Sequence, residues 1–343
     1  EIRIIHEMKM MRLEGAEVYL AYRENSLIKD EAIANNIKVF SLPFRGNTDL
    51  KTLFHLKKII KYYSIDIVNT HSGKDTWVGG LAAKLTGVKF IRTRHLSNKI
   101  NPSRLNFINE LADYIFTTGE KVRDDMIEYN RIKANKIISI PTGIDESIFN
   151  PESFNREECR KKLTINDSEI AIGILAVLRQ FKRHDLFLKM AKSLIKKYPG
   201  KRLVFIIAGN GPQKENIEKI INDLNLAENV KMVGHINNVP EFLCAIDILV
   251  LSSDSKEGVP QSVMQGLFMN KPVVSSDSGS TRDLFNHNNF QLIQKGSIEA
   301  LINGVSIYLD NMNEVSSRKY MMENFSSSVM VKKIMTSYEK ILE

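Results

Sequence analysis

Residues 202–224 read RLVFIIAGNGPQKENIEKIINDL and contain one complete strand–turn–helix unit. Residues 202–208 form a short apolar run of the kind that is buried in a parallel sheet. The segment GNGP (residues 209–212) supplies turn residues, and residues 214–224 have the spacing of a helix. Because a strand that leads at once into a helix is the repeating unit of a parallel sheet, this stretch predicts an α/β fold.

The same unit recurs on both sides of this stretch, with short connections. Strands are expected at residues 17–22, 38–42, 66–69, 89–92, 114–117 and 137–140, and again at 170–177, 202–208, 230–233, 246–252 and 272–275. Helices are expected between them, among others at residues 76–85, 104–111, 239–245, 260–269 and 298–310. This alternation predicts two Rossmann-like domains, each with a parallel doubly wound sheet and helices on both faces.

The proposed domain boundary lies in residues 141–151, which contain two prolines and have little periodicity. We expect an N-terminal domain over residues 1–145 and a C-terminal domain over residues 146–326. A last amphipathic helix in residues 327–343 should pack back towards the N-terminal domain. Because the chain begins with a helical pattern at residues 1–15, we also expect an opening strand and a glycine-rich loop before Glu1. The alternative is a domain that begins with a helix.

Composition excludes several classes of protein. The chain has 343 residues, of which 43% are hydrophobic, so it can bury two ordinary cores. Its two cysteines, Cys159 and Cys244, show no metal-ligand spacing. A disulfide framework or a structural zinc site is therefore not expected, and a cytoplasmic location fits. No apolar run approaches the length of about 18 residues that a membrane-spanning helix needs.

Positive charge is concentrated in one segment. The net charge is +8, and residues 51–100 contain ten Lys and Arg against two acids. Such a segment attracts phosphates, acidic lipid head groups or nucleic acid. The alternative is a solvated helix face, since Lys57, Lys58 and Lys61 lie on one amphipathic stretch. We do not expect nucleic-acid binding, because the segment lacks the interleaved aromatic residues of a stacking platform.

The segment EGVPQSVMQ (residues 257–265) follows an apolar strand and carries the clearest chemistry. Pro260 suits the first turn of a helix, and Gly258 lets the backbone approach a ligand closely. The unpaired N–H groups at the start of that helix, near Val259, Gln261 and Ser262, form a site for a diphosphate. Glu257 can accept hydrogen bonds from sugar hydroxyls. The alternative is a capped buried helix in which Glu257 complements the helix dipole.

This segment resembles the EGxP(x)4E signature of glycosyltransferase family 4, the retaining group 1 enzymes with the GT-B fold. The resemblance covers most of the chain, and its order and spacing are specific. Four more segments carry it: PTGID (residues 141–145) with Phe149 and Pro151, GNGP (209–212), VGH (233–235), and KPVV (271–274) with Gly279. In that family the opening helix follows a GGxE-type loop, in line with the expectation above.

The resemblance implies a donor site in the C-terminal domain. Glu257 matches the glutamate that contacts the donor sugar, and Lys182 matches a phosphate-binding lysine. Gln265 replaces the glutamate that usually binds the ribose; an amide still hydrogen-bonds a ribose, though without charge assistance. The arginine usual five residues before the lysine is replaced by Val177. We expect Arg179 to supply the second positive charge, the alternative being a surface role.

The N-terminal domain resembles the acceptor-side domain of the family. The segment THS (residues 70–72) and the segment TRH (residues 93–95) each follow an expected strand. The second resembles the family's T-x-H segment, whose histidine reaches the donor sugar, so His95 joins Glu257, Lys182 and Arg179 as a candidate catalytic residue. Four side chains are expected on the acceptor side: His71, Lys74, Arg94 and Lys99. Arg104 is only a surface candidate.

The resemblance therefore implies a hexosyltransferase. It would move a sugar from a nucleotide diphosphate sugar to a hydroxyl of a saccharide or of a glycolipid, lipopolysaccharide or polysaccharide precursor, with retention of configuration. No cofactor and no metal are expected, and peripheral contact with an anionic membrane is a hypothesis. The alternatives are a nucleotide-sugar epimerase or a phosphorylase of the same fold, and a non-catalytic nucleotide-sugar-binding protein.

Overall fold

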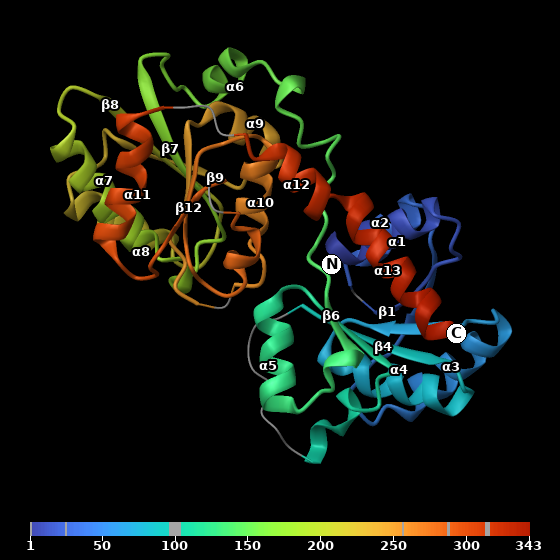
Figure 1. Ribbon diagram of the computed structural model, residues 1–343. Coiled ribbons are helices and arrows are strands. Elements are labelled where there is room, and N and C mark those ends of the chain that lie inside the picture. The colour runs from blue at the N-terminus through green and yellow to red at the C-terminus, as the bar shows by residue number, and fades with distance from the viewer. Residues whose placement is uncertain (1, 25, 96–103, 256, 287–288, 313–315) are drawn as a thin grey trace. The chain divides into compact units, whose positions relative to one another are not determined.

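The computed structural model describes residues 2–24, 26–95, 104–255, 257–286, 289–312 and 316–343. The chain forms two compact units (Figure 1). The N-terminal unit contains Glu1–Gly143 together with Ser327–Glu343, and the C-terminal unit contains Ile144–Ser326. The sequence placed the first boundary at residues 145 and 146 and the second at residues 326 and 327.

The strands of the N-terminal unit form two parallel sheets instead of the single sheet that we expected. One sheet pairs β1 with β2, and the other has the order β3-β4-β5-β6. The strands are β1 (Tyr19–Arg23), β2 (Lys38–Leu42), β3 (Ile67–Thr70), β4 (Lys89–Arg94), β5 (Tyr114–Thr117) and β6 (Ile137–Ser139). Ala21 of β1 and Val68 of β3 pack against one hydrophobic cluster, so the same layers cover both sheets. The strand expected before Glu1 stays a prediction.

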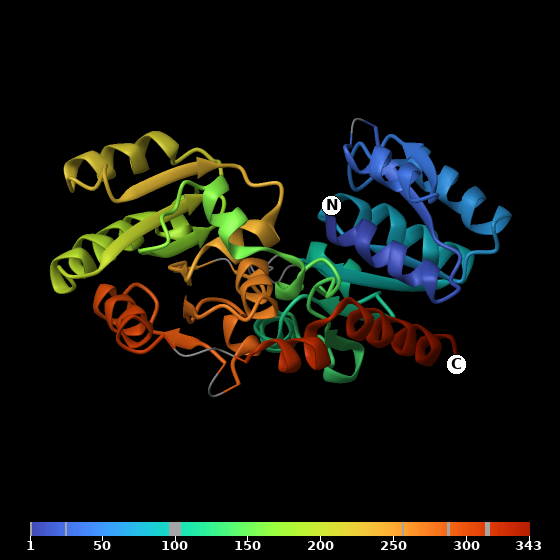
Figure 2. The same cartoon turned by 90° about the horizontal axis from the view of Figure 1, so that it is seen from above.

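Helices cover both faces of this unit. They are α1 (Ile2–Leu13), α2 (Ile28–Ala34), α3 (Leu50–Tyr62), α4 (Gly73–Thr86), α5 (Glu120–Asn130) and α13 (Ser327–Leu342). Helices α1 and α13 lie side by side, and Met11 and Ile334 share a cluster with Ile91 of β4 (Figure 2). Helix α4 approaches β4 closely because Gly80 lacks a side chain: a Cβ there would lie 2.6 Å from the ring of Phe90.

The C-terminal unit has one parallel sheet with the order β12-β11-β10-β7-β8-β9. Its strands are β7 (Glu169–Leu175), β8 (Arg202–Ala208), β9 (Val230–Gly234), β10 (Ile248–Leu251), β11 (Val273–Ser276) and β12 (Gln291–Ile293). Its helices are α6 (Arg156–Lys162), α7 (His184–Lys197), α8 (Lys214–Asp223), α9 (Val239–Ala245), α10 (Gln261–Phe268), α11 (Ile298–Asp310) and α12 (Arg318–Phe325).

The side chains of this sheet alternate between two hydrophobic clusters. Phe205 and Ile207 of β8 pack with α7, α8 and α11, whereas Val204 and Ile206 pack with α6, α9, α10 and α12. A parallel sheet that is buried on both faces reads as a continuous apolar run, as residues 202–208 do. The helices on both faces in Figure 1 follow from this alternation.

Four elements that matter here differ from the sequence prediction. Strand β12 and helix α12 were not predicted, and residues 104–111 form a 3-10 helix over Arg104–Asn109 instead of an α-helix. Helix α4 begins at Gly73, earlier than the predicted start at Thr76. A capping box explains this start: Ser72 caps the helix and the Asp75 carboxylate accepts from the Ser72 backbone N–H.

Candidate functional site

The loops after the C-terminal strands join into one continuous rim, which we call the strand-end rim. It lies at the carboxyl ends of β7 to β11, where ligands of parallel α/β sheets bind. Four backbone hydrogen bonds connect neighbouring loops: Gly209 N to Gly234 O at 2.7 Å, Leu178 N to Asn210 O at 3.0 Å, Asp254 N to Phe181 O at 3.0 Å, and Ser280 N to Gly258 O at 3.2 Å. The rim therefore holds the predicted donor residues on connected backbone.

Two glycines permit the close approach of these loops. Gly209 has φ of 141°, and a Cβ there would lie 1.9 Å from the carbonyl oxygen of Ala176. Gly279 has φ of 62°, and a Cβ there would lie 1.9 Å from the carbonyl oxygen of Glu257. Both positions require glycine because of their backbone conformation and because of the space available. The glycines of the GNGP turn and of the segment after β11 thus shape the backbone beside the candidate site.

Lys182 and Glu257 form an ion pair within the rim. The distance from Lys182 Nζ to Glu257 Oε1 is 2.5 Å, and the two side chains are 15% and 9% exposed. Lys182 comes from the loop after β7 and Glu257 from the loop after β10, and these strands are neighbours in the sheet. The sequence named both residues as donor ligands, and the structure brings them into direct contact.

Helix α10 begins one residue later than the sequence predicted. Pro260 has an extended conformation and is the N-cap instead of a residue of the first turn, and the helix starts at Gln261. The first backbone bond of the helix runs from Met264 N to Pro260 O at 3.2 Å. The N–H groups of Gln261, Ser262 and Val263 therefore have no partner within the helix. Val259 lies outside it, and Gln265 lies in its second turn.

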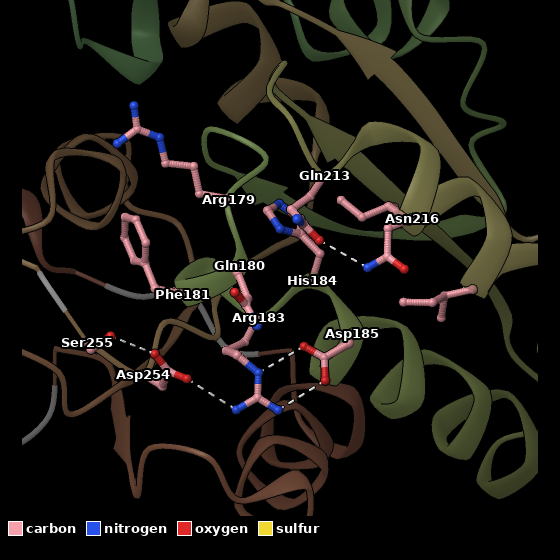
Figure 3. Close-up of a pocket in the computed structure, with 12 residues that line it drawn as sticks. Arg179, Gln180, Phe181, Arg183, His184, Asp185, Gln213, Asn216, Asp254 and Ser255 are labelled. Carbon is pink, nitrogen blue, oxygen red and sulfur yellow. Dashed lines mark hydrogen bonds and ion pairs between the residues drawn. The ribbon is translucent and has the colours of Figure 1, made fainter.

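Arg179 lines a pocket of about 640 Å³, whose lining includes the chain neighbours of Lys182 but neither Lys182 nor Glu257. Arg183 lies at the centre of the pocket's charged residues: its guanidinium contacts both oxygens of Asp185, at 2.9 and 3.0 Å, and Asp254 at 3.3 Å (Figure 3). Figure 3 also shows the Arg179 side chain extending away from this cluster. Arg183, which sequence reasoning did not assign, therefore pairs with two acids of the pocket lining, Asp185 and Asp254.

Buried polar atoms without partners also gather at the rim. His184 is 3% exposed, and neither of its ring nitrogens has a hydrogen-bond partner among the described residues. The Oγ atoms of Ser253 and Ser278, just after β10 and β11, are likewise buried and unpaired in that part of the chain. Burial, reinforced by the charge of Lys182, lowers the pKa of His184 to about 4. Unsatisfied buried groups are rare, and they are typical of functional sites.

The N-terminal unit brings His71 and His95 together. His71 directly follows β3 and His95 directly follows β4, and these parallel strands are paired. The distance from His71 Nδ1 to His95 Nε2 is 3.0 Å. The ring centroids lie 5.2 Å apart and the ring planes are inclined by 21°, so the two rings meet nearly edge to edge. Sequence reasoning named both residues but did not predict their contact.

A buried arginine and an aspartate hold the loop that carries His71. Asp75 accepts hydrogen bonds from the backbone N–H groups of His71 and Ser72, at 3.1 and 2.8 Å. Arg92 donates to the carbonyl oxygen of Ser72 at 2.6 Å and also contacts Thr76 and Asp75. Burial raises the pKa of Asp75 and lowers the pKa of Arg92 to about 10.

Comparison with known proteins identifies this pair of units. Residues 155–326, half of the chain, match the family of glycosyl transferases group 1, and residues 1–148 match Glycosyltransferase Family 4. The chain belongs to the group 1 glycosyltransferases. The resemblance stated from the sequence is thereby confirmed.

Similar proteins agree with this assignment. The glycosyltransferase is 25% identical over 357 residues to the UDP-Gal:alpha-D-GlcNAc-diphosphoundecaprenol alpha-1,3-galactosyltransferase of Escherichia coli, over 97% of this chain and 92% of that protein. The structure of a glycosyltransferase from Rickettsia africae ESF-5 matches with a TM-score of 0.90 at 19% identity, over 99% of this chain and 94% of that one. Anabaena Alr3699/HepE in complex with UDP and glucose matches with a TM-score of 0.81 at 16% identity, over 99% and 95%. These likenesses confirm the predicted GT-B fold.

Not every acceptor-side candidate of this glycosyltransferase can be placed. Arg94 ends β4 beside His95, and burial lowers its pKa. Lys74 lies in the first turn of α4. Lys99 lies outside the described residues, and Arg104 begins a 3-10 helix. The structure therefore brings His71 and His95 together and leaves the acceptor role of the basic residues a prediction.

Proposed function

We propose that this group 1 glycosyltransferase moves a hexose from a nucleotide diphosphate sugar to a hydroxyl of a glycolipid, lipopolysaccharide or polysaccharide precursor, with retention of configuration and without a metal ion. The observation that carries the proposal is the Lys182–Glu257 pair beside the start of α10. A cation, a carboxylate and three free backbone N–H groups are the groups that a diphosphate with a sugar attached requires.

In this proposal the two charges of the pair serve different parts of the donor. Lys182, the N–H groups of Gln261 and Ser262, and Arg179 neutralise the diphosphate and stabilise the charge that develops on the leaving group. Glu257 accepts hydrogen bonds from hydroxyls of the transferred sugar. Gln265 in the second turn of α10 contacts the ribose through its amide.

We propose that retention is achieved without a covalent intermediate. A double displacement would need a carboxylate nucleophile. Asp75 lies beside His71, but both of its oxygens already accept backbone hydrogen bonds. We therefore propose a front-face substitution: the acceptor oxygen bonds to the anomeric carbon, the bond from that carbon to the phosphate oxygen breaks, and the released phosphate takes the acceptor proton. His95 contacts the transferred sugar as a neutral hydrogen-bonding group.

The names of similar proteins suggest the first substrates to test. The Escherichia coli relative is named for UDP-Gal and a diphosphoundecaprenol-linked acceptor, and the Anabaena structure holds UDP. Binding of UDP, GDP, ADP and CMP should be compared by calorimetry, followed by transfer from the sugar of the preferred nucleotide to a lipid-diphosphate-linked GlcNAc. NMR of the product reports its anomeric configuration, and chelator treatment tests metal independence. Equal, negligible binding of every nucleotide would contradict the donor site.

Helix α3 offers a surface for a membrane-bound acceptor. Thr52, Leu56 and Ile60 face the core, while the opposite side exposes large apolar and basic side chains. We call these residues the α3 surface: Leu50, Lys51, Phe54, Lys58, Lys61 and Tyr62. Apolar side chains among lysines suit the interface of an anionic membrane. Among the described residues, no helix has the length and apolar character needed to cross a bilayer.

Vesicle binding tests this surface directly. The double variant Phe54→Ser and Lys58→Glu should lose sedimentation with anionic phospholipid vesicles at low salt, because it removes an apolar contact and reverses a charge. The matched control is Lys219→Glu, a charge reversal on the exposed side of α8 in the C-terminal unit. Equal binding of all three proteins, or equal binding to zwitterionic vesicles, would contradict the membrane contact.

A further inference from the structure

The contact between His71 and His95 constrains both rings. A neutral imidazole has one nitrogen that donates and one that accepts. Because His71 Nδ1 and His95 Nε2 lie 3.0 Å apart, one of them must carry the proton and the other must accept it. The remaining nitrogens, His71 Nε2 and His95 Nδ1, have no hydrogen-bond partner among the described residues. Their roles are therefore opposite: when one is a donor, the other is an acceptor.

The surroundings keep this pair uncharged. Burial lowers the pKa of His95 to about 3, reinforced by the positive charges of Arg3, Arg92 and Arg94. Burial, reinforced by the nearby His95, Arg3 and Arg92, lowers the pKa of His71 well below its usual value. The charged groups around the pair are Arg3 of α1, Arg92 and Arg94 of β4, and Asp75 of α4. In the neutral pair each ring carries one proton, so one of the two facing nitrogens donates and the other accepts.

His71 is itself held in place, so it is able to hold another ring. Its backbone N–H donates to Asp75 Oδ2 at 3.1 Å. Asp75 belongs to the capping box of α4, and Arg92 donates to the carbonyl oxygen of the capping residue Ser72. The loop that carries His71 is thereby fixed to α4 and to β4. By contrast, the His95 side chain hydrogen-bonds only His71 among the described residues, and its carbonyl oxygen accepts from Thr118 Oγ1 at 3.4 Å.

We propose that His71 is a positioning residue for His95: through its Nδ1 it fixes the orientation of the His95 ring and couples the tautomer of that ring to its own. This inference rests on the proposed function, in which His95 contacts the transferred sugar. A ring with a fixed tautomer offers the sugar either a donor or an acceptor at Nδ1, and not a mixture of the two. Positioning of this kind lowers the cost of reaching the reactive geometry.

The first experiment needs no substrate. Long-range proton–nitrogen NMR of the full ¹⁵N-labelled chain from pH 8 to pH 5 reports the tautomer of each of its seven histidines. We expect His95 to show one protonated and one unprotonated nitrogen throughout. His71→Asn should preserve this pattern, because the Asn amide replaces Nδ1, whereas His71→Leu should give tautomer-averaged signals. Averaged signals in the wild type, or an unchanged His95 in His71→Leu, would overturn the proposal.

The second experiment separates positioning from substrate contact and from structure. His71→Leu and His71→Gln should lower kcat roughly 10- to 100-fold with nucleotide affinity unchanged, while His71→Asn stays within about threefold. If His71→Gln kept full activity while His71→Asn lost it, His71 would contact the substrate directly through Nε2. If kcat fell in all three variants in proportion to a fall in their melting temperature, the role of His71 would be structural. Either outcome overturns positioning. Lys192→Leu on the exposed side of α7 is the control and should leave kcat unchanged.

The two experiments distinguish this inference from the proposed function. If no nucleotide sugar is turned over but the NMR pattern is as expected, the donor assignment fails and the histidine contact stands. If sugar transfer is observed while His95 shows no fixed tautomer, the transferase assignment stands and His71 loses its positioning role.

Discussion

Replacing Glu257 by glutamine should change donor binding in two opposite directions. In the structure the Glu257 carboxylate holds Lys182 at 2.5 Å, so a diphosphate that binds Lys182 competes with this carboxylate. Glu257→Gln keeps the size of the side chain and removes its charge. The nucleotide diphosphate alone should then bind more tightly, while transfer of the sugar, which needs the carboxylate, should slow.

The magnitude follows from the environment of the pair. Its side chains are 15% and 9% exposed, so solvent screens their attraction only in part. A hydrogen bond to a charged group contributes about 1.5–3 kcal/mol and a neutral one about 0.5–1.5 kcal/mol, which leaves a difference of about 1 kcal/mol. We therefore expect UDP to bind about fivefold more tightly. Loss of the carboxylate contact to the sugar should lower kcat/KM about 10- to 100-fold.

Calorimetry with UDP and steady-state kinetics with its sugar measure the two effects separately. Lys182→Met should weaken UDP binding about 10- to 100-fold, because it removes the cation. Glu241→Gln is a matched control: Glu241 pairs with Lys162 at 2.6 Å in the same unit, with the side chains 29% and 59% exposed, and should leave both quantities unchanged. If Glu257→Gln weakens UDP binding as much as Lys182→Met does, the competition argument is wrong.

Three further predictions follow from the same structure. Gly279→Ala places a Cβ 1.9 Å from the Glu257 carbonyl oxygen at a φ of 62°. The variant should lose about 2–4 kcal/mol of unfolding free energy, measured by urea unfolding. An unchanged free energy of unfolding would show that the loop moves freely. His95 and His184 have pKa values of about 3 and about 4 in the folded protein, below the ordinary 6.5. The unfolded chain therefore binds protons first as pH falls through 6.5, so folding stability should decline from pH 6.5 towards pH 4, by about 1.4 kcal/mol per pH unit for each histidine. Constant stability between pH 7 and pH 5 would contradict their burial as neutral groups. Gln265→Glu should tighten UDP binding about fivefold, because its contacts with the ribose gain charge assistance, and weaker binding by calorimetry would remove Gln265 from the ribose site.

The sequence predicted most elements of the C-terminal unit because their signals are local. Strand β8 and helices α9 and α11 coincide with the predicted residues, since each has a continuous apolar run or helical spacing of its own. Strand β12 has only three residues, and of the eight residues of α12 only Met321 is buried. These two elements form because the neighbouring β11 and α10 offer surfaces, which is information that no short segment contains.

The pairing between strands could not be predicted from the local sequence pattern either. All six described strands of the N-terminal unit were predicted, but not their division into two sheets. Apolar alternation identifies a strand without naming its partner. The same limit explains why the contact between the two histidines was not predicted. Parallel topology places His71 and His95 at one edge of a sheet, but the contact between their rings depends on the pairing of β3 with β4.

The two candidate sites share one physical feature. Lys182 and Glu257 neutralise each other, and His71 and His95 share one proton, so each set of reactive groups is satisfied by its own partner. Left unpaired at this degree of burial, each group would cost the fold a large part of its stability. A diphosphate that binds Lys182 then exchanges one anion for another and leaves the Glu257 carboxylate to a sugar hydroxyl. Donor affinity in this protein should therefore depend on the strength of the Lys182–Glu257 pair as much as on the contacts made with the donor itself.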